Sequence, residues 1–260
     1  MSRTLFYLLC LPAIYLLGCK SQSKEILLDL HLDSQIKEII EGAINKAGGF
    51  GVWQNLAKIK FDKVTELYDS LGHTELRTDQ HHRYHIRPKH ILEIIWQDST
   101  GNHQLMLRNN QLEKYVNGSE DPDIDSTAGH NMLLSAEYAA LLPFKLLDIG
   151  LQFYYEGTDT LSGKNVHIVR TEFPGNSDNK NVSSDIWWHY FNTRDYTHEG
   201  YLVKHADHFS LVINEDFAKD ERLILPSRRS SYRVDSAGNY LYKRADYWYD
   251  NYHMRFSEPQ

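Results

Sequence analysis

Histidine offers the most distinctive chemistry in this sequence, which contains 14 of them. His81, Arg83 and His85 alternate along a predicted strand, so their side chains share one face. Two imidazoles on one face can begin a metal site, but Arg83 between them would repel a cation. His205 and His208 would point to opposite faces of a strand, although in a turn they could converge. We expect solvated side chains at both places and predict no bound metal.

Other catalytic motifs are missing from the sequence. It contains no G-x-S-x-G, no His-Glu-x-x-His, no P-loop and no G-x-G-x-x-G. Residues 34–37 and 21–24 match S-x-x-K, but the first should begin a helix and the second lies in a polar segment. Asp121, Asp123 and Asp125 alternate as at the start of a calcium loop, yet the central Gly and the final Glu are absent. We predict neither an enzyme nor a cofactor.

The composition excludes several classes of protein. The chain has 260 residues, of which 41% are hydrophobic, 24% charged and 12% aromatic, as in a globular domain. Lys and Arg number 28 against 35 Asp and Glu, which gives a formal net charge of -7. A generic nucleic-acid binder would be basic, so no nucleic-acid partner is predicted.

The first residues have the pattern of an export signal. Residues 5–17 form an apolar stretch that is too short to span a bilayer as a helix but suits a secretory signal. The stretch ends in Leu-Leu-Gly-Cys at residues 16–19, which resembles the lipobox of bacterial lipoproteins. The resemblance implies that residues 1–18 are removed as a lipoprotein signal peptide and that Cys19 is lipidated. The alternative is an ordinary signal peptide in which Cys19 occurs by chance.

Lipidation of Cys19 would make residues 19–33 a tether to a membrane, because each buried methylene of an acyl chain contributes about 0.8 kcal/mol. Lys20 follows the cysteine where an aspartate would signal inner-membrane retention in enteric bacteria. No acidic cluster follows that would suggest surface export. We therefore expect an outer-membrane lipoprotein facing the periplasm. The only other cysteine, Cys10, lies in the signal, so cysteine-based catalysis is not expected.

The remaining chain has mainly β patterning and two helices. Ile36, Ile39, Ile40 and Ile44 define the apolar face of a helix at 34–47, with Ser34 as its expected N-cap. Short alternating segments follow from Trp53 onward. These segments are 59–61, 74–87, 91–97, 103–108, 112–116, 151–156, 164–173, 184–192, 200–206, 208–215, 221–234 and 239–253.

A second helix is predicted in the middle of the chain, at residues 132–147, broken at Pro143. It follows an acidic, turn-rich stretch at 119–130 that we expect to be a loop. The helix is apolar almost all round, so it must be buried or must cover something apolar. With a proline, charged residues and only this length, it does not fit a transmembrane span.

The order of helix, meander, apolar helix and second meander resembles the lipoprotein-carrier (LolA/LolB-like) fold of Gram-negative bacteria. Three local patterns resemble it too: Gly49 with Trp53 and Leu56, the segment 142–148, and Leu-Pro-Ser-Arg-Arg-Ser-Ser-Tyr at 225–232. The resemblance implies an α+β, mostly β fold at residues 34–256, a single antiparallel half-open β-barrel of about eleven strands with a helical plug or lid. The anchored receptor of this family has an exposed leucine-tipped loop after an early strand, which is not identified here because the turns are polar.

Together these features predict a membrane-anchored, non-catalytic lipoprotein that binds an apolar ligand, a lipid acyl chain or a lipoprotein, in the half-barrel. The predicted ligand-binding residues are Leu133, Leu141, Phe144, Leu147, Phe153 and Trp187. Trp187 and Trp188 are adjacent, so one should face the core and the other the opposite side of the sheet. Two alternatives stay open: a structural or interaction lipoprotein with a filled barrel, and a sugar-binding or hydrolytic module that uses the histidines and aromatic residues.

Overall fold

The computed structural model describes residues 32–121, 125–172, 185–218 and 222–257, which form strands with few helices. The helices are α2 (Ser34–Lys46), α3 (Phe50–Asn55), α4 (Ser126–Ala140) and the 3-10 helix η1 (Phe144–Leu147). The strands are β1 (Leu56–Tyr68), β2 (Thr74–His85), β3 (Ile91–Asp98), β4 (Gly101–Arg108), β5 (Gln111–Val116), β6 (Ser119–Glu120), β7 (Gln152–Leu161), β8 (Lys164–Glu172), β9 (Ile186–Asn192), β10 (His198–Lys204), β11 (Phe209–Phe217), β12 (Pro226–Val234) and β13 (Tyr240–Phe256).

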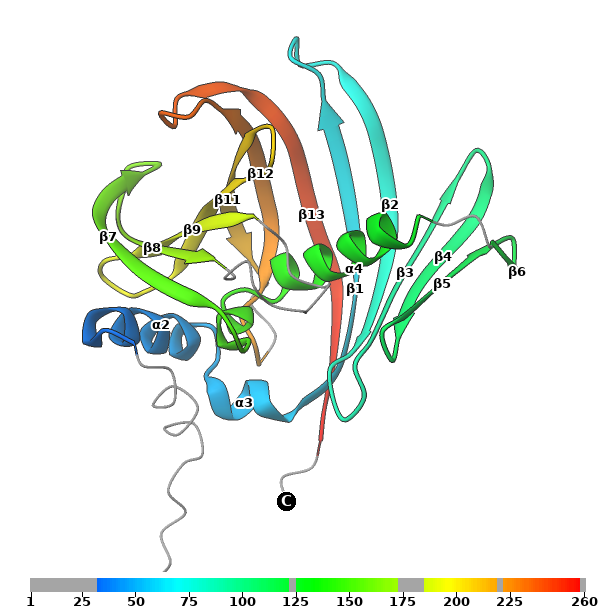
Figure 1. The fold of residues 1–260 in the computed structure, drawn as a ribbon, viewed down its shortest axis with the longest axis horizontal. Coiled ribbons are helices and arrows are strands. Elements are labelled where there is room, and N and C mark those ends of the chain that lie inside the picture. The colour runs from blue at the N-terminus through cyan, green and yellow to red at the C-terminus, as the bar shows by residue number, and fades with distance from the viewer. Residues whose placement is uncertain (1–31, 122–124, 173–184, 219–221, 258–260) are drawn as a thin grey trace, which may run out of the picture.

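All strands within these ranges belong to one antiparallel sheet, in the order β6-β5-β4-β3-β2-β1-β13-β12-β11-β10-β9-β8-β7. Neighbours in the sheet are neighbours in the sequence except at one place, where β1 pairs with β13. The two edges, β6 and β7, are not joined, and the sheet curves around α4 (Figure 1). The predicted mostly β, antiparallel and open architecture is confirmed. The expected number of about eleven strands is wrong, because the described part of the sheet has thirteen.

The alternation of side chains gives the sheet two different faces. In β1, Ile59 and Phe61 are buried on the concave face, whereas Lys58 and Lys60 are exposed on the convex face. The main apolar core therefore lies between the concave face and the helices. Every described residue of this core lies between Leu32 and Phe256, so a chain that starts at residue 20 keeps all of them. Among the helices that the structure describes, none is long and apolar enough to cross a membrane.

The N-terminal helices differ in detail from the prediction. Asp33, and not Ser34, caps α2, because its carboxylate accepts the backbone N–H of Gln35 at 2.8 Å. The short helix α3 was not predicted. It contains Trp53, from which the sequence pattern predicts strands. Its ring stacks on Phe144 of η1, with ring centroids 4.9 Å apart. Strand β1 begins after α3, at Leu56.

The mid-chain helix starts earlier than predicted and lies across the concave side of the sheet (Figure 1). Asp125 caps it by accepting the backbone N–H groups of Thr127 and Ala128 at 3.0 Å, so α4 begins inside the stretch predicted as a loop. It ends at Ala140, before Pro143, as the missing N–H of proline requires. It packs against β3, β4 and β5.

Helix α2 is fastened to the turn between β9 and β10. The ring of Tyr196 lies over Gly42, its hydroxyl donates to Glu38 at 2.6 Å, and Lys46 forms a 2.6 Å ion pair with Asp195. A Cβ atom at Gly42 would overlap the Tyr196 ring. The glycine therefore serves close packing between the helix and the turn.

This contact predicts a reversal of a normal helix preference. Gly42→Ala should lower the unfolding free energy by about 1–3 kcal/mol, although alanine in a helix is usually favoured by about 1 kcal/mol. The same substitution in a Tyr196→Ala background should be stabilising, because the ring is gone. Urea denaturation of the two single variants and the double variant measures this coupling. Additive effects of the two substitutions would contradict the packing argument.

Candidate functional site

The six predicted ligand-binding residues lie in one apolar cluster on the concave side. Three of them are fully buried there, and the other three are partly buried and pack against the same cluster. The fully buried set is Leu133, Leu141 and Phe144, and the partly buried set is Leu147, Phe153 and Trp187. The structure thus brings the predicted residues together, with α4 and η1 contributing three of the six and Leu141 lying at the C-cap of α4.

Aromatic side chains connect α4 with the sheet. Tyr138 of α4 contacts the indole of Trp187, with ring centroids 4.9 Å apart, and Trp187 lies at the same distance from Tyr201 of β10. Trp188 points to the other face, where its indole N–H donates to Glu156 at 3.0 Å. The predicted division of the two tryptophans between the faces is confirmed.

A buried arginine beneath α4 is the main polar feature of this face. Arg229 of β12 is 1% exposed, and its Nη2 donates to the backbone carbonyl of Ala139 at 2.7 Å. Its Nε donates to Oδ1 of Asn214 at 2.7 Å, and Nη1 lies 3.4 Å from the Tyr249 hydroxyl. Tyr201 and Tyr249 also present their ring faces to the guanidinium. A cation at the C-terminal end of a helix is favourable, so Arg229 holds that end of α4 on the sheet.

Two buried histidines lie next to this arginine network. Nδ1 of His189 in β9 is 3.3 Å from Nε2 of His198 in β10, and Thr171 lies 3.1 Å from the other nitrogen of His189. Burial lowers the pKa of His189 to about 3. Burial, His189 and the Arg229 cation lower the pKa of His198 well below its usual value. Both imidazoles are therefore neutral near pH 7, and they link strands within the core.

The other attachment of α4 is ionic. Glu137 is 3% exposed, and its carboxylate contacts Nε2 of His90 at 2.7 Å and Nζ of Lys145 at 3.3 Å. Lys145 also pairs with Asp148 at 2.6 Å. Burial acts to raise the pKa of Glu137, but the hydrogen bond from His90 and the charge of Lys145 outweigh it and lower the pKa. The helix was predicted to be apolar almost all round, and Glu137 is a charged residue of this helix that faces inward.

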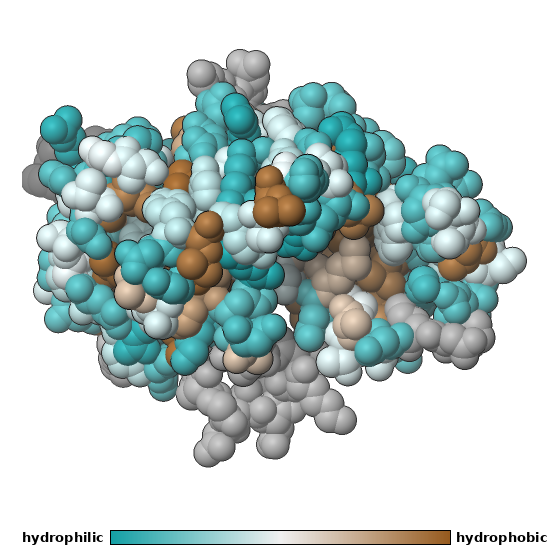
Figure 2. Space-filling view, turned by 90° about the horizontal axis from the view of Figure 1, so that it is seen from above, coloured by the Kyte–Doolittle hydropathy of each residue, from teal (hydrophilic) through white to brown (hydrophobic). Residues whose placement is uncertain are grey.

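The concave side remains partly open to solvent from the upper rim. Figure 2 shows that the surface is hollowed over the half of the molecule formed by β1 to β5 and α4, and that apolar side chains gather in this hollow. A second, smaller opening of about 100 Å³ lies where the chain leaves α4. Leu142 and Pro143 line it together with His198 and Asn214 of the polar network and Ala43 of α2.

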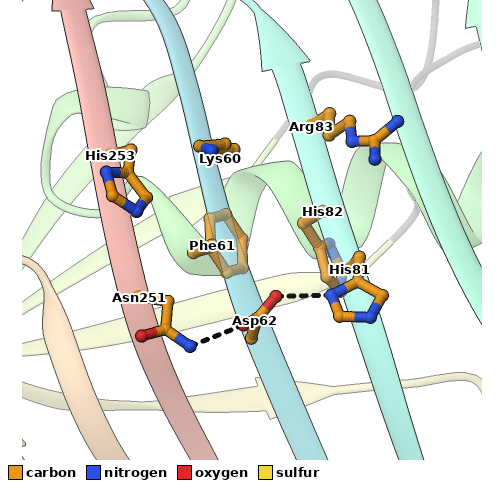
Figure 3. A pocket seen from close by; sticks show the side chains of 8 residues that line it. All are labelled: Lys60, Phe61, Asp62, His81, His82, Arg83, Asn251 and His253. Carbon is orange, nitrogen blue, oxygen red and sulfur yellow. Dashed lines mark hydrogen bonds and ion pairs between the residues drawn. The ribbon is translucent and has the colours of Figure 1, made fainter.

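The structure places the predicted histidine pairs outside this face. Oδ1 of Asp62 lies 2.5 Å from Nδ1 of His81, so a carboxylate distant in sequence pairs with this histidine. Figure 3 shows both residues in a shallow pocket on the face opposite α4. His205 and His208 converge in a turn, with ring centroids 4.5 Å apart. The described part of the chain has no group of three or more histidine, cysteine or acidic side chains that could hold a metal.

Two aspartates of the calcium-like pattern, Asp121 and Asp125, make different contacts in the structure. Asp125 caps α4, and Asp121 forms a 2.6 Å ion pair with Lys114. Asp123 lies outside the described residues, as do Cys19, the predicted signal peptide and most of the predicted tether.

Sequence reasoning missed the residues that hold α4. Arg228 and Arg229 are adjacent on a predicted strand, so alternation alone requires one of them to face inward. The same signal exists at His81 and His82, of which His82 is buried. These adjacent pairs mark buried polar positions, but the choice of the buried member depends on register.

An exposed leucine was missed as well. Leu71 lies in the turn between β1 and β2 and is 80% exposed. Asp69 holds this turn by accepting the backbone N–H groups of Leu71 and His73 at 2.8 Å. The hairpin projects beyond the rest of the sheet (Figure 1). The chain therefore has a leucine-tipped loop after an early strand, although the polar turns of the sequence did not indicate one.

No protein-family model and no curated protein matches the sequence. Solved structures do match. A LolA superfamily protein from Nitrosomonas europaea has a TM-score of 0.54 and 11% identity, over 85% of this chain and 94% of that one. A DUF1329 family protein from Desulfovibrio piger has a TM-score of 0.53 and 6% identity, over 84% and 92% of the two chains. The predicted LolA-like fold is confirmed.

The buried histidines predict how stability depends on pH. The unfolded chain protonates His189 near pH 6.5, whereas the folded chain does so only near pH 3. Between these values the unfolded state binds more protons, so stability falls as the pH falls, by up to about 1.4 kcal/mol per pH unit for this histidine. Urea denaturation between pH 6.5 and 4 should therefore show a shallower pH dependence for His189→Gln than for the wild-type chain.

Val169→Ala is the matched control. Val169 is fully buried and lies directly opposite His189 in the sheet, but it does not titrate. This variant should lose stability at every pH and keep the wild-type slope. Equal slopes for His189→Gln and the wild-type chain would contradict the assignment of a neutral buried imidazole.

Proposed function

We propose that this protein is a non-catalytic carrier or receptor that binds an apolar ligand, a lipid acyl chain or the acyl chains of a lipoprotein, against the concave face beneath α4. The single observation that supports this most is the apolar hollow on that face, beside a helix that covers the rest of it. Ligand sites are commonly concave and mostly apolar, with few polar groups. The LolA-like fold is consistent with such a role.

The way α4 is attached supports its role as a lid. Directional polar contacts, from Arg229 to Ala139 and from Glu137 to His90 and Lys145, set its position. Buried ion pairs contribute little net stability, since desolvation offsets their attraction, but they specify one arrangement. Moving the helix breaks these contacts, so they hold it in place until a bound ligand compensates for their loss. Displacement would expose Leu133, which now fills the space a ligand needs.

The anchoring of the chain is part of the proposal. Lipidation at Cys19 after removal of residues 1–18 would tether the domain at 34–256 through residues 19–33. We place it at the outer membrane, facing the periplasm, on the lipobox resemblance and on Lys20. The exposed Leu71 would then be available to contact an incoming acyl chain.

One observation favours a second candidate, a structural lipoprotein whose half-barrel is filled. Leu133, Leu141 and Phe144 are fully buried, and Phe144 stacks on Trp53. In that case α4 would be part of a permanent core. The two candidates differ in whether α4 moves, so an experiment on its attachment separates them.

The test uses the chain from residue 20 and a fluorescent fatty acid. We expect saturable uptake by the wild-type chain and co-purified lipid in its native mass spectrum. Arg229→Met removes the bond to the carbonyl of Ala139, so it should raise the rate of uptake several-fold while lowering the melting temperature. Stopped-flow fluorescence and thermal denaturation measure the two effects.

Arg228→Met is the matched control, because Arg228 is the adjacent, exposed residue on the opposite face. It should leave both the uptake rate and the melting temperature close to wild type. If neither the wild-type chain nor the Arg229 variant takes up the fatty acid and no lipid co-purifies, the filled barrel is correct and the carrier is not.

A further inference from the structure

Six basic side chains occupy two adjacent rows on the convex face of β13, β1 and β2. In the first row, Lys58 lies directly between His85 and Arg255 on the neighbouring strands. In the second row, two residues further along β1, Lys60 takes the corresponding position. We call these residues the basic rows; they are Arg255, Lys58 and His85, then His253, Lys60 and Arg83.

The basic rows are unfavourable for the sheet itself. Like charges directly opposite each other on one face destabilise strand pairing. Burial and the Lys58 cation lower the pKa of His85, the Glu93 carboxylate acts to raise it, and the Arg108 cation lowers it further. In the ranges that the structure covers, Lys58 and Lys60 form no ion pair, and Arg83 has only a 3.4 Å contact with Glu93.

The next positions along the same face are acidic on β1 and β13. Asp62 lies opposite Asp250 and Glu66 opposite Asp246, whereas on the β2 side Asp62 pairs with His81 and Glu66 lies opposite Arg77. The chain as a whole is acidic, with a net charge of -7, so the rows do not reflect a general excess of lysine and arginine. Nor do they protect a sheet edge, because β1 is a central strand.

The second row, His253, Lys60 and Arg83, also lines a pocket of about 310 Å³ (Figure 3). Asp62 is the carboxylate in this pocket, and both of its oxygens are engaged. Oδ1 contacts His81 at 2.5 Å, and Oδ2 accepts the side-chain amide of Asn251 at 2.7 Å. Lys60, which forms no ion pair in the described part of the chain, is therefore available to an external anion, while Arg83 also contacts Glu93 at 3.4 Å.

We propose that the basic rows bind the anionic head groups of a membrane surface. The rows are broad and exposed, as a surface of many phosphates requires, and their charge complements it. They lie where β1 begins and β13 ends, at the same end of the sheet as α2 and α3 (Figure 1). Residues 20–32 precede α2 and can span up to about 45 Å, so a chain anchored at Cys19 can place this face on the bilayer. The proposal does not depend on a ligand in the concave face.

The test measures binding of the chain from residue 20 to vesicles by co-sedimentation. Vesicles of phosphatidylcholine with about one third phosphatidylglycerol should bind it at least about tenfold more tightly than phosphatidylcholine alone, with a loss of binding at high salt. Each cation near an anionic surface contributes about fivefold in affinity, so Lys58→Glu/Lys60→Glu should weaken binding by about 30-fold or more.

Thermal denaturation provides an independent readout. Because the double substitution replaces repulsion within the rows by attraction, it should raise the melting temperature while it abolishes vesicle binding. If Lys58 and Lys60 served only to stabilise the fold, replacing them would lower the melting temperature instead. The control variant is Arg194→Glu/Lys204→Glu, which makes the same change in net charge at exposed positions on the other half of the sheet. It should bind vesicles almost like the wild-type chain.

Three results would overturn the proposal. They are equal affinity for anionic and zwitterionic vesicles, wild-type affinity of the Lys58/Lys60 variant, and equal loss of affinity in the control variant. Fatty-acid uptake by the same variants separates this proposal from the carrier function, because the rows lie on the face opposite α4. Uptake should be unchanged in the Lys58/Lys60 variant, whether or not vesicle binding is lost.

Discussion

A buried guanidinium that has no carboxylate partner among the described residues is the constraint around which the concave side is organised. Transfer of an unpaired charge from water into the protein interior costs several kcal/mol unless polar groups replace the lost hydration. For Arg229 these groups are the side-chain amide of Asn214, the ring faces of two tyrosines and the backbone carbonyl of Ala139 near the end of α4. The helix end is thus part of the solvation of the cation, and its position cannot change without leaving donors of Arg229 unsatisfied.

The same constraint explains why so many polar side chains share the core. Asn214 uses its carbonyl oxygen for Arg229, and its amide nitrogen donates to the backbone carbonyl of His198 at 2.6 Å. His198 contacts His189, which contacts Thr171. Each of these side chains contacts the next, so one polar network connects the five consecutive strands from β8 to β12. Protonation of His198 would place a second positive charge near Arg229, and protonation of His189 would place a charge in the core, which is why acid should weaken this side of the sheet.

Much of this fold could be predicted from the sequence, because alternation of apolar and polar residues indicates strands directly. The turns and most strand limits followed from this pattern, as did the division of Trp187 and Trp188 between the faces. The helix α3 was missed because its six residues are too few to show a helical period. The polar network could not be predicted, since it depends on register: only the pairing of β11 with β12 places Asn214 opposite Arg229. Leu71 was missed because a single apolar residue in a polar turn carries no periodicity.

The pairing of β1 with β13 has a consequence for how the chain reaches this structure. It joins two meanders, β2 to β6 and β7 to β12, each of which pairs only strands that follow one another in the sequence. Local hairpins close quickly, whereas contacts between distant segments require a long loop to be ordered first. The two meanders therefore cannot pair with each other until β13, a strand of 17 residues, is available to pair with β1. A ribosome or a translocation channel that still holds β13 keeps the polypeptide in two parts, and the sheet becomes continuous only once this strand is free to pair.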